Sequence, residues 1–189
     1  MKKGEAGYIS SKKIRAIIKV VLEFGIVAAL LLLGIQQTGD RMNWLTLVAI
    51  LGCLPASKAL VELIMIVPHR SIEKEKAEEL HEKIEILTMV YDLVLTSEHH
   101  IMPIDVLAIS DNMICGYSSS AKLDISFATK HIKQMLGMNQ MNNITVKIFD
   151  NYTSFITRAE GMQNIASVEK RDTKQKEERI KQVILNISL

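Results

Sequence analysis

Residues 14–35 read IRAIIKVVLEFGIVAALLLLGI, and residues 44–67 read WLTLVAILGCLPASKALVELIMIV. These two apolar runs decide the fold of the chain, and the polar break QQTGDRMN (residues 36–43) separates them. An α-helix rises about 1.5 Å per residue, so each run is long enough to cross a hydrocarbon core of roughly 30 Å. The sequence therefore predicts a transmembrane helical hairpin over residues 14–67.

Basic residues flank this hairpin on the side away from the break. They are Lys2, Lys3, Lys12 and Lys13 before the first run, Arg15 at its start, and His69, Arg70, Lys74 and Lys76 after the second. The break itself contains one arginine and one aspartate. Because positively charged flanks stay on the cytoplasmic side, both termini are expected in the cytoplasm and the short break outside. The first expected partner of the chain is thus the lipid bilayer.

Each apolar run also carries a lysine and a glutamate four residues apart. The pairs are Lys19 with Glu23 and Lys58 with Glu62, each near the cytoplasmic end of its run. Such charges cost about 2.5 to 3.5 kcal/mol each at mid-bilayer unless they are paired. One interpretation is an intramembrane cluster of four charges that fixes the register of the hairpin. The other is that the lysines extend to the interface and the carboxylates follow them.

The rest of the chain predicts one small cytoplasmic domain attached through a stalk. Residues 1–13 are expected to be a polar lead-in, flexible or interfacial. Residues 68–97 are expected to form a stalk and packing helix capped by Ser71, because apolar side chains recur there at steps of three and four. This helix either packs inside the domain or forms an oligomeric coiled coil. Residues 98–189 are expected to form the domain itself.

Short apolar segments and turn residues give the order of elements in that domain. The expected strands are 104–110, 113–117, 144–149 and 183–189, and the expected helices are 122–138, 153–167 and a charged helix or linker over 169–181. Asp111 and Asn112 form the turn between the first two strands. The predicted fold class is therefore α+β, with helices packed on a mixed β-sheet behind the transmembrane hairpin.

Charge and cysteine content exclude some classes of partner and bond. The net charge of +2 is small, and the sequence contains no basic stretch interleaved with aromatic residues. No nucleic acid is therefore expected as a partner. Cys53 lies inside the second apolar run and Cys115 in the soluble part. A disulfide between the two phases is not expected, which fits a reducing cytoplasm.

The sequence contains no motif that defines an active site, so no catalytic residue, cofactor or metal ligand is expected. Weak candidates for a pocket are His99, His100, Asp105, Ser119 and Lys122. Adjacent histidines diverge, which disfavours a shared metal. Ser119 and Lys122 fit S-x-x-K, in which the lysine activates the serine, but the accompanying K-T-G and S-D-N motifs are missing. A serine that caps a helix explains the same residues.

The strand pair that begins at Asp105, followed by a helix and a further strand, resembles the core of the restriction-endonuclease-like nucleases. In that superfamily an early strand carries a metal-binding aspartate and the next strand carries E-x-K. Asp105 matches the first position, whereas the next strand reads ICGYSS and no lysine occurs before Lys122. The resemblance covers about 50 residues and implies an inactive version of that domain rather than a nuclease.

The favoured interpretation is a membrane-anchored cytoplasmic interaction or scaffold module. It would bind a protein partner and form homo-oligomers through the hairpin or the stalk helix. One alternative is a membrane-tethered enzyme or inactive restriction-endonuclease-like domain, which should gather Asp105 with other polar groups in a pocket. The other alternative is an accessory subunit of a membrane transport complex, which should depend on Glu23 and Glu62.

Overall fold

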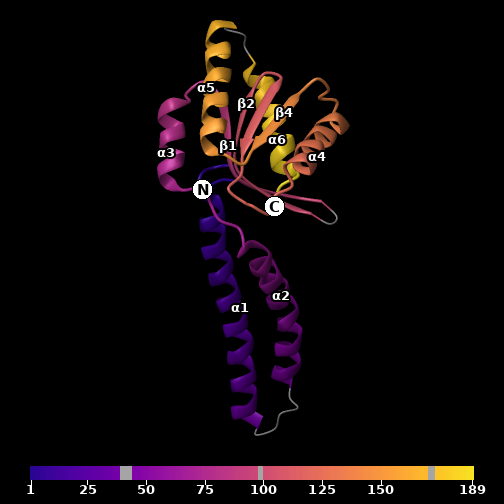
Figure 1. Ribbon diagram of the computed structural model, residues 1–189. Coiled ribbons are helices and arrows are strands. Elements are labelled where there is room, and N and C mark those ends of the chain that lie inside the picture. The colour runs from indigo at the N-terminus through magenta and orange to yellow at the C-terminus, as the bar shows by residue number, and fades with distance from the viewer. Residues whose placement is uncertain (39–43, 98–99, 170–172) are drawn as a thin grey trace. The chain divides into compact units, whose positions relative to one another are not determined.

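The computed structural model describes residues 1–38, 44–97, 100–169 and 173–189. The chain divides into two compact units (Figure 1). The hairpin unit is Ile9–Arg70, and the α+β unit combines Met1–Tyr8 with Ser71–Leu189. The expectation of a flexible lead-in is therefore wrong for the first eight residues, which belong to the folded α+β unit. Residues 39–43 of the predicted break lie outside the described residues.

The hairpin unit consists of helices α1 (Tyr8–Thr38) and α2 (Trp44–Ile66). Both are long and apolar enough to cross a membrane. Ala49, Ala56 and Ala59 of α2 are buried, and a Cβ placed on Gly52 would lie 3.1 Å from Val27 Cγ2 on α1. Small residues of this kind let two helix backbones approach closely.

The α+β unit contains the remaining elements. They are α3 (Lys74–Lys83), β1 (Thr88–Thr96), β2 (Ile101–Ser110), β3 (Met113–Tyr117), α4 (Ile125–Met138), β4 (Thr145–Phe149), α5 (Tyr152–Glu169) and α6 (Lys174–Asn186). The strands form a sheet in the order β1-β2-β3-β4. β1 pairs with β2 and β2 with β3 in antiparallel orientation, whereas β4 runs parallel to β3 after the crossover helix α4. The predicted α+β class and mixed sheet are confirmed.

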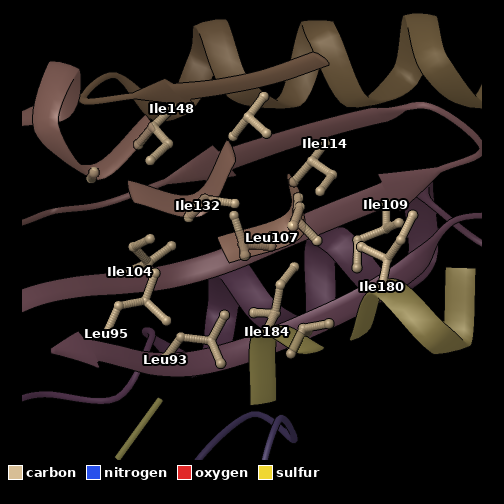
Figure 2. Packing of buried hydrophobic residues seen from close by; sticks show 14 of the residues in the cluster. Leu93, Leu95, Ile104, Leu107, Ile109, Ile114, Ile132, Ile148, Ile180 and Ile184 are labelled. Carbon is tan, nitrogen blue, oxygen red and sulfur yellow. The ribbon is translucent and has the colours of Figure 1, made fainter. Parts of the chain in front are cut away.

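Both faces of the sheet are covered by helices. One core lies between the sheet and helices α4 and α6, where Ile132, Ile180 and Ile184 pack against strand residues such as Leu93 and Leu107 (Figure 2). The other core lies between the sheet and helices α3 and α5. Its largest fully buried side chains include Leu80, Phe155 and Met162. The unit is therefore a three-layer sandwich around the sheet.

The predicted single helix over residues 71–97 is wrong. Helix α3 has Glu73 as its N-cap instead of Ser71, ends at Lys83, and gives way to strand β1. Tyr91 packs in the core of α3 and α5, whereas Val90 and Leu93 pack in the core of α4 and α6. A strand buried on both faces has apolar residues without strict alternation, and this pattern imitates two apolar columns on a helix.

The predicted closing strand at residues 183–189 is also wrong. Helix α6 continues to Asn186, because Ile180 and Ile184 are one turn apart and both face the sheet. A single antiparallel bridge between Ser188 and Leu95 follows it. The predicted helix over 122–138 starts three residues later, because the Asp124 carboxylate caps α4 by accepting a 2.9 Å hydrogen bond from the Phe127 N–H.

Candidate functional site

Two of the candidate pocket residues, Asp105 and Ser119, are in contact through a hydrogen bond. Asp105 lies on β2, and its Oδ2 accepts a 2.8 Å hydrogen bond from the Ser119 N–H in the loop after β3. The same loop is held by the Ser118 hydroxyl, which donates to the Pro103 carbonyl at 2.7 Å. The Asp105 side chain is buried, with its residue only 8% exposed. Its carboxylate therefore fixes a loop and is hardly accessible to a substrate.

Burial is the main influence on the acidity of Asp105. Loss of hydration raises the pKa of the Asp105 carboxyl, and the neighbouring charge of Asp92 adds to this. Hydrogen bonds from Ser119 and the charge of Lys76 act in the opposite direction without cancelling the shift. Asp105 is thus a carboxyl group that takes up a proton more readily than an exposed aspartate.

Lys76 is the positive charge that acts on this carboxylate, and it lies over the rings of two tyrosines. The Lys76 ammonium on α3 lies 5.8 Å from the ring centre of Tyr117 and 5.4 Å from that of Tyr152, and it pairs with Glu73 at 2.9 Å. The Tyr152 hydroxyl donates to Glu79 Oε2 at 2.8 Å. Burial and this hydrogen bond raise the pKa of Tyr152, so its hydroxyl stays protonated at neutral pH. These contacts tie α3 and α5 to the sheet.

The other sequence candidates do not join Asp105. His99 lies outside the described residues. His100 is exposed, and its ring centre is 4.3 Å from that of Phe127 on α4. Lys122 is exposed in the loop that precedes α4. Of the candidate pocket residues that the structure describes, only Asp105 and Ser119 are thus shown in contact with each other.

The charges of the hairpin show one contact between the two helices. Lys19 Nζ on α1 lies 3.9 Å from Glu62 Oε2 on α2. Oε2 of Glu23 is buried and has no hydrogen-bond partner within the described residues. The cluster of all four charges, with Lys58 as its last member, stays a prediction.

Two buried acids escaped sequence reasoning. Asp92 lies on β1, within the segment predicted as helix, and is 3% exposed. Glu177 on α6 is also 3% exposed and accepts hydrogen bonds from the hydroxyls of Thr88 and Thr173 and from the Asp111 N–H. An acidic residue inside an otherwise apolar strand, as in VYDLVL, was a signal for Asp92. Glu177 sits in a charged run and gave no such signal.

The chemistry available to these groups is limited. Burial raises the pKa of the Cys115 thiol on β3 to about 12, so this cysteine is a poor nucleophile. Among the described residues, no group of three or more His, Cys, Asp or Glu side chains could hold a metal ion. The strand that aligns with the E-x-K position, β3, reads MICGY. Asp105 and Asp92 act on their own chain by holding backbone groups.

Two cavities open at the surface of the α+β unit. The first, of about 520 Å³, lies between residues 2–6, β1 and α6, and its lining includes Lys2, Glu5 and Lys181. The second, of about 260 Å³, lies between the β2–β3 turn and the end of α5. Neither is lined by Asp105 or Ser119.

In comparisons with known proteins, no family model, no curated protein and no solved structure matches this chain significantly.

Proposed function

We propose that this chain is a membrane-anchored cytoplasmic interaction module. Residues 9–70 insert as a two-span hairpin, both termini lie in the cytoplasm, and the α+β unit binds a protein partner there. Three features support this proposal. They are the connectivity of the two units, the exposed apolar surface of the hairpin helices, and the hydrogen bonds that the buried acids make within the α+β unit.

The observation that carries the proposal is that one folded unit contains the chain on both sides of the hairpin. Met1–Tyr8 and Ser71–Leu189 pack together, so both ends of the hairpin lead into the same unit. A folded unit lies on one side of a membrane. An inserted hairpin would therefore enter and leave on that side, which supports two spans joined by a loop across the membrane.

The surface of the hairpin helices favours lipid as their environment. In the most apolar windows of α1 and α2, only 11% and 17% of the residues are buried. Large apolar side chains such as Leu32 and Leu54 are 64% and 68% exposed. Apolar surface of this extent needs a cover, and a bilayer covers helices of this length. The basic flanks favour the cytoplasmic placement of both ends.

The α+β unit supports binding rather than catalysis because its buried acids bind groups of the unit itself. Asp105 holds the Ser119 N–H, Asp92 holds the Ile72 N–H, and Glu177 holds two hydroxyls and one N–H. The surface is then the part of the unit that is open to other molecules.

Site-specific photo-crosslinking in native membranes tests the proposal. A photoreactive residue would replace Val168, an apolar side chain on α5 that is 81% exposed, with the exposed Lys130 on α4 as the matched control position. We expect a protein adduct of defined mass from position 168 in the membrane fraction, absent from position 130. Recovery of the chain in the soluble fraction, or the same adducts from both positions, would contradict the proposal.

A further inference from the structure

The outer edge of strand β1 is covered along only part of its length. The Tyr91 N–H donates to the Gly4 carbonyl at 2.8 Å, and the Val94 carbonyl accepts a hydrogen bond from the Leu189 N–H at 2.9 Å. Two segments outside the sheet thus bind this edge, one near residue 4 and one near residue 189. Both contacts lie at or after Tyr91, so they leave the beginning of β1 uncovered.

Met89 presents backbone groups at the beginning of this edge. Residues 88–91 pair with residues 109–106 in unbroken antiparallel register. In such a pair the N–H and C=O of every second residue point away from the neighbouring strand. Because the Tyr91 N–H points away from β2, the N–H and C=O of Met89 point away as well. Within the part of the chain that the structure describes, no group outside the sheet binds them, and Met89 is partly exposed.

The cavity of about 520 Å³ lies against this edge. Its volume falls within the range of roughly 300 to 1,000 Å³ that is usual for ligand sites. Met89 and Tyr91 border it on β1, and residues 2–6 border it on a second side. Its lining on α6 consists of Glu178, Lys181, Gln182 and Leu185. The whole lining belongs to the α+β unit, so the cavity exists whether or not the hairpin inserts into a membrane.

The lining of the cavity carries more positive than negative charge. Its charged residues are Lys2, Lys3 and Lys181 against Glu5 and Glu178. Both acids already accept hydrogen bonds, Glu5 from the Lys2 backbone N–H at 2.7 Å and Glu178 from the Lys181 ammonium at 3.2 Å. The Lys2 ammonium is exposed and makes no ion pair with any residue that the structure describes. A carboxylate that enters the cavity is therefore attracted to Lys2 and Lys181.

We propose that this cavity binds an extended acidic segment of the protein partner, which adds as a strand to the edge of β1. The main chain of the segment pairs with the N–H and C=O of Met89, and an acidic side chain binds Lys2 and Lys181. Unpaired groups on a sheet edge are the usual basis for this mode of peptide binding. The binding of a protein segment rests on the proposed function as an interaction module, and the cavity specifies where on the α+β unit it occurs.

Hydrogen exchange resolved to single amides, on the full chain in detergent micelles, tests this site. The probe is the peptide acetyl-Thr-Val-Glu-Val-Thr-amide at concentrations up to about 5 mM. Strand addition gives the Met89 N–H a partner, so exchange of this amide should slow about threefold or more. The Val146 N–H is the matched control at the opposite edge of the sheet, because its neighbour Thr145 donates to Asn112 and Val146 therefore faces away from β3. Its exchange should not change.

Changes in the peptide and in the chain separate the backbone contact from the charge contact. Replacement of the glutamate by lysine, or N-methylation of the three central residues, should each weaken peptide binding about threefold or more. In the chain, Lys2→Gln combined with Lys181→Gln should weaken binding of the glutamate peptide about three- to tenfold. The matched pair Lys130→Gln and Lys133→Gln, at exposed positions on α4, should leave it unchanged.

Unchanged exchange of Met89 with the glutamate peptide would overturn the inference, as would equal slowing of Met89 and Val146 or equal binding of the glutamate and lysine peptides. Inorganic phosphate in place of the peptide should leave Met89 unchanged. If phosphate slows its exchange as much as the peptide does, the cavity is a site for small anions and the inference is wrong. These results would leave the membrane anchor and the adduct at position 168 unaffected, whereas recovery of the chain in the soluble fraction would contradict the proposed function without abolishing peptide binding.

Discussion

Replacement of Glu177 by glutamine should destabilise the α+β unit in a pH-dependent way. The Glu177 carboxylate accepts hydrogen bonds from the Thr88 hydroxyl at 2.6 Å, the Thr173 hydroxyl at 2.8 Å and the Asp111 N–H at 3.3 Å. Together these donors join α6 to β1 and to the β2–β3 turn. Hydrogen bonds to a charged group contribute about 1.5 to 3 kcal/mol each, but glutamine keeps one acceptor oxygen and the volume. We expect a loss of about 1 to 2 kcal/mol for Glu177→Gln and about 3 kcal/mol for Glu177→Ala.

The direction of the pH dependence follows from the environment of the carboxylate. Burial alone would raise the pKa of Glu177, but the hydrogen bonds from Thr88, Thr173 and Asp111 and the charge of Lys174 outweigh it and lower the pKa. A group whose pKa is lowered by folding stabilises the protein above its unfolded pKa of about 4.3. This contribution disappears as the pH falls through the folded pKa. The difference between wild type and Glu177→Gln should therefore be constant near neutrality and shrink below about pH 4.

Urea denaturation of the full chain in detergent micelles measures this effect. All four tyrosines lie in the α+β unit and the single tryptophan lies in the hairpin, so near-UV circular dichroism of tyrosine reports on the correct unit. Glu178→Gln is the matched control, because Glu178 is an exposed neighbour paired with Lys181, and it should cost less than about 0.5 kcal/mol. Equal stability of wild type and Glu177→Gln at neutral pH would contradict this role of Glu177, as would a difference that stays undiminished at pH values below the folded pKa of Glu177.

Two further predictions concern β3. A Cβ on Gly116 would overlap Leu107 Cδ2 and lie 3.4 Å from the Val106 carbonyl oxygen, so Gly116→Ala should cost about 1 to 3 kcal/mol in the same urea assay. The added substitution Leu107→Val should recover part of this loss, and no recovery would mean that the backbone contact is responsible. Cys115 is buried with its pKa raised to about 12, so in a Cys53→Ser chain maleimide should modify it only as fast as the unit unfolds. Rapid and complete modification of the folded chain at neutral pH would show that the thiol is accessible.

The elements that sequence patterns predicted correctly are those with strong local signals. Asp111 and Asn112 mark the turn between β2 and β3, and the segment ITVKIF alternates clearly enough to predict β4. Helix α4 shows the 3.6-residue period, although its N-cap is Asp124 and not the serine expected ahead of residue 122. These features depend on a few neighbouring residues and need no knowledge of the rest of the fold.

Strand β1 could not be predicted in the same way because its pattern depends on two layers of helices. Val90, Leu93 and Leu95 belong to one core and Tyr91 packs in the other, so the strand shows neither strict alternation nor a turn signal. The positive φ of 54° at Asp92 adds a further irregularity to this strand. The strand prediction for residues 183–189 was wrong for the opposite reason. These residues alternate between apolar and polar side chains, whereas the helical period of α6 becomes visible only when Ile180, in the charged part of the helix, is included.

The candidate site was predictable in part. Asp105 stood out as an acid within an apolar strand, and its contact with Ser119 follows from the β2–β3 pairing. Asp92 had a local signal in VYDLVL, but its position beside Asp105 could not be predicted, because the pairing of β1 with β2 depends on β1 being a strand. The packing of residues 1–8 with the sheet is likewise a tertiary effect that local patterns do not contain.

Labelling of single cysteines with a membrane-impermeant maleimide shows whether the hairpin spans the membrane with both chain segments of the α+β unit in the cytoplasm. Gln37→Cys lies at the end of α1, and Lys2→Cys and Lys130→Cys lie in the two chain segments of the α+β unit. In intact cells we expect labelling of position 37 alone, with positions 2 and 130 labelled only after the membrane is opened. Labelling of positions 2 and 130 from opposite sides, or of all three positions from the same side, would contradict it.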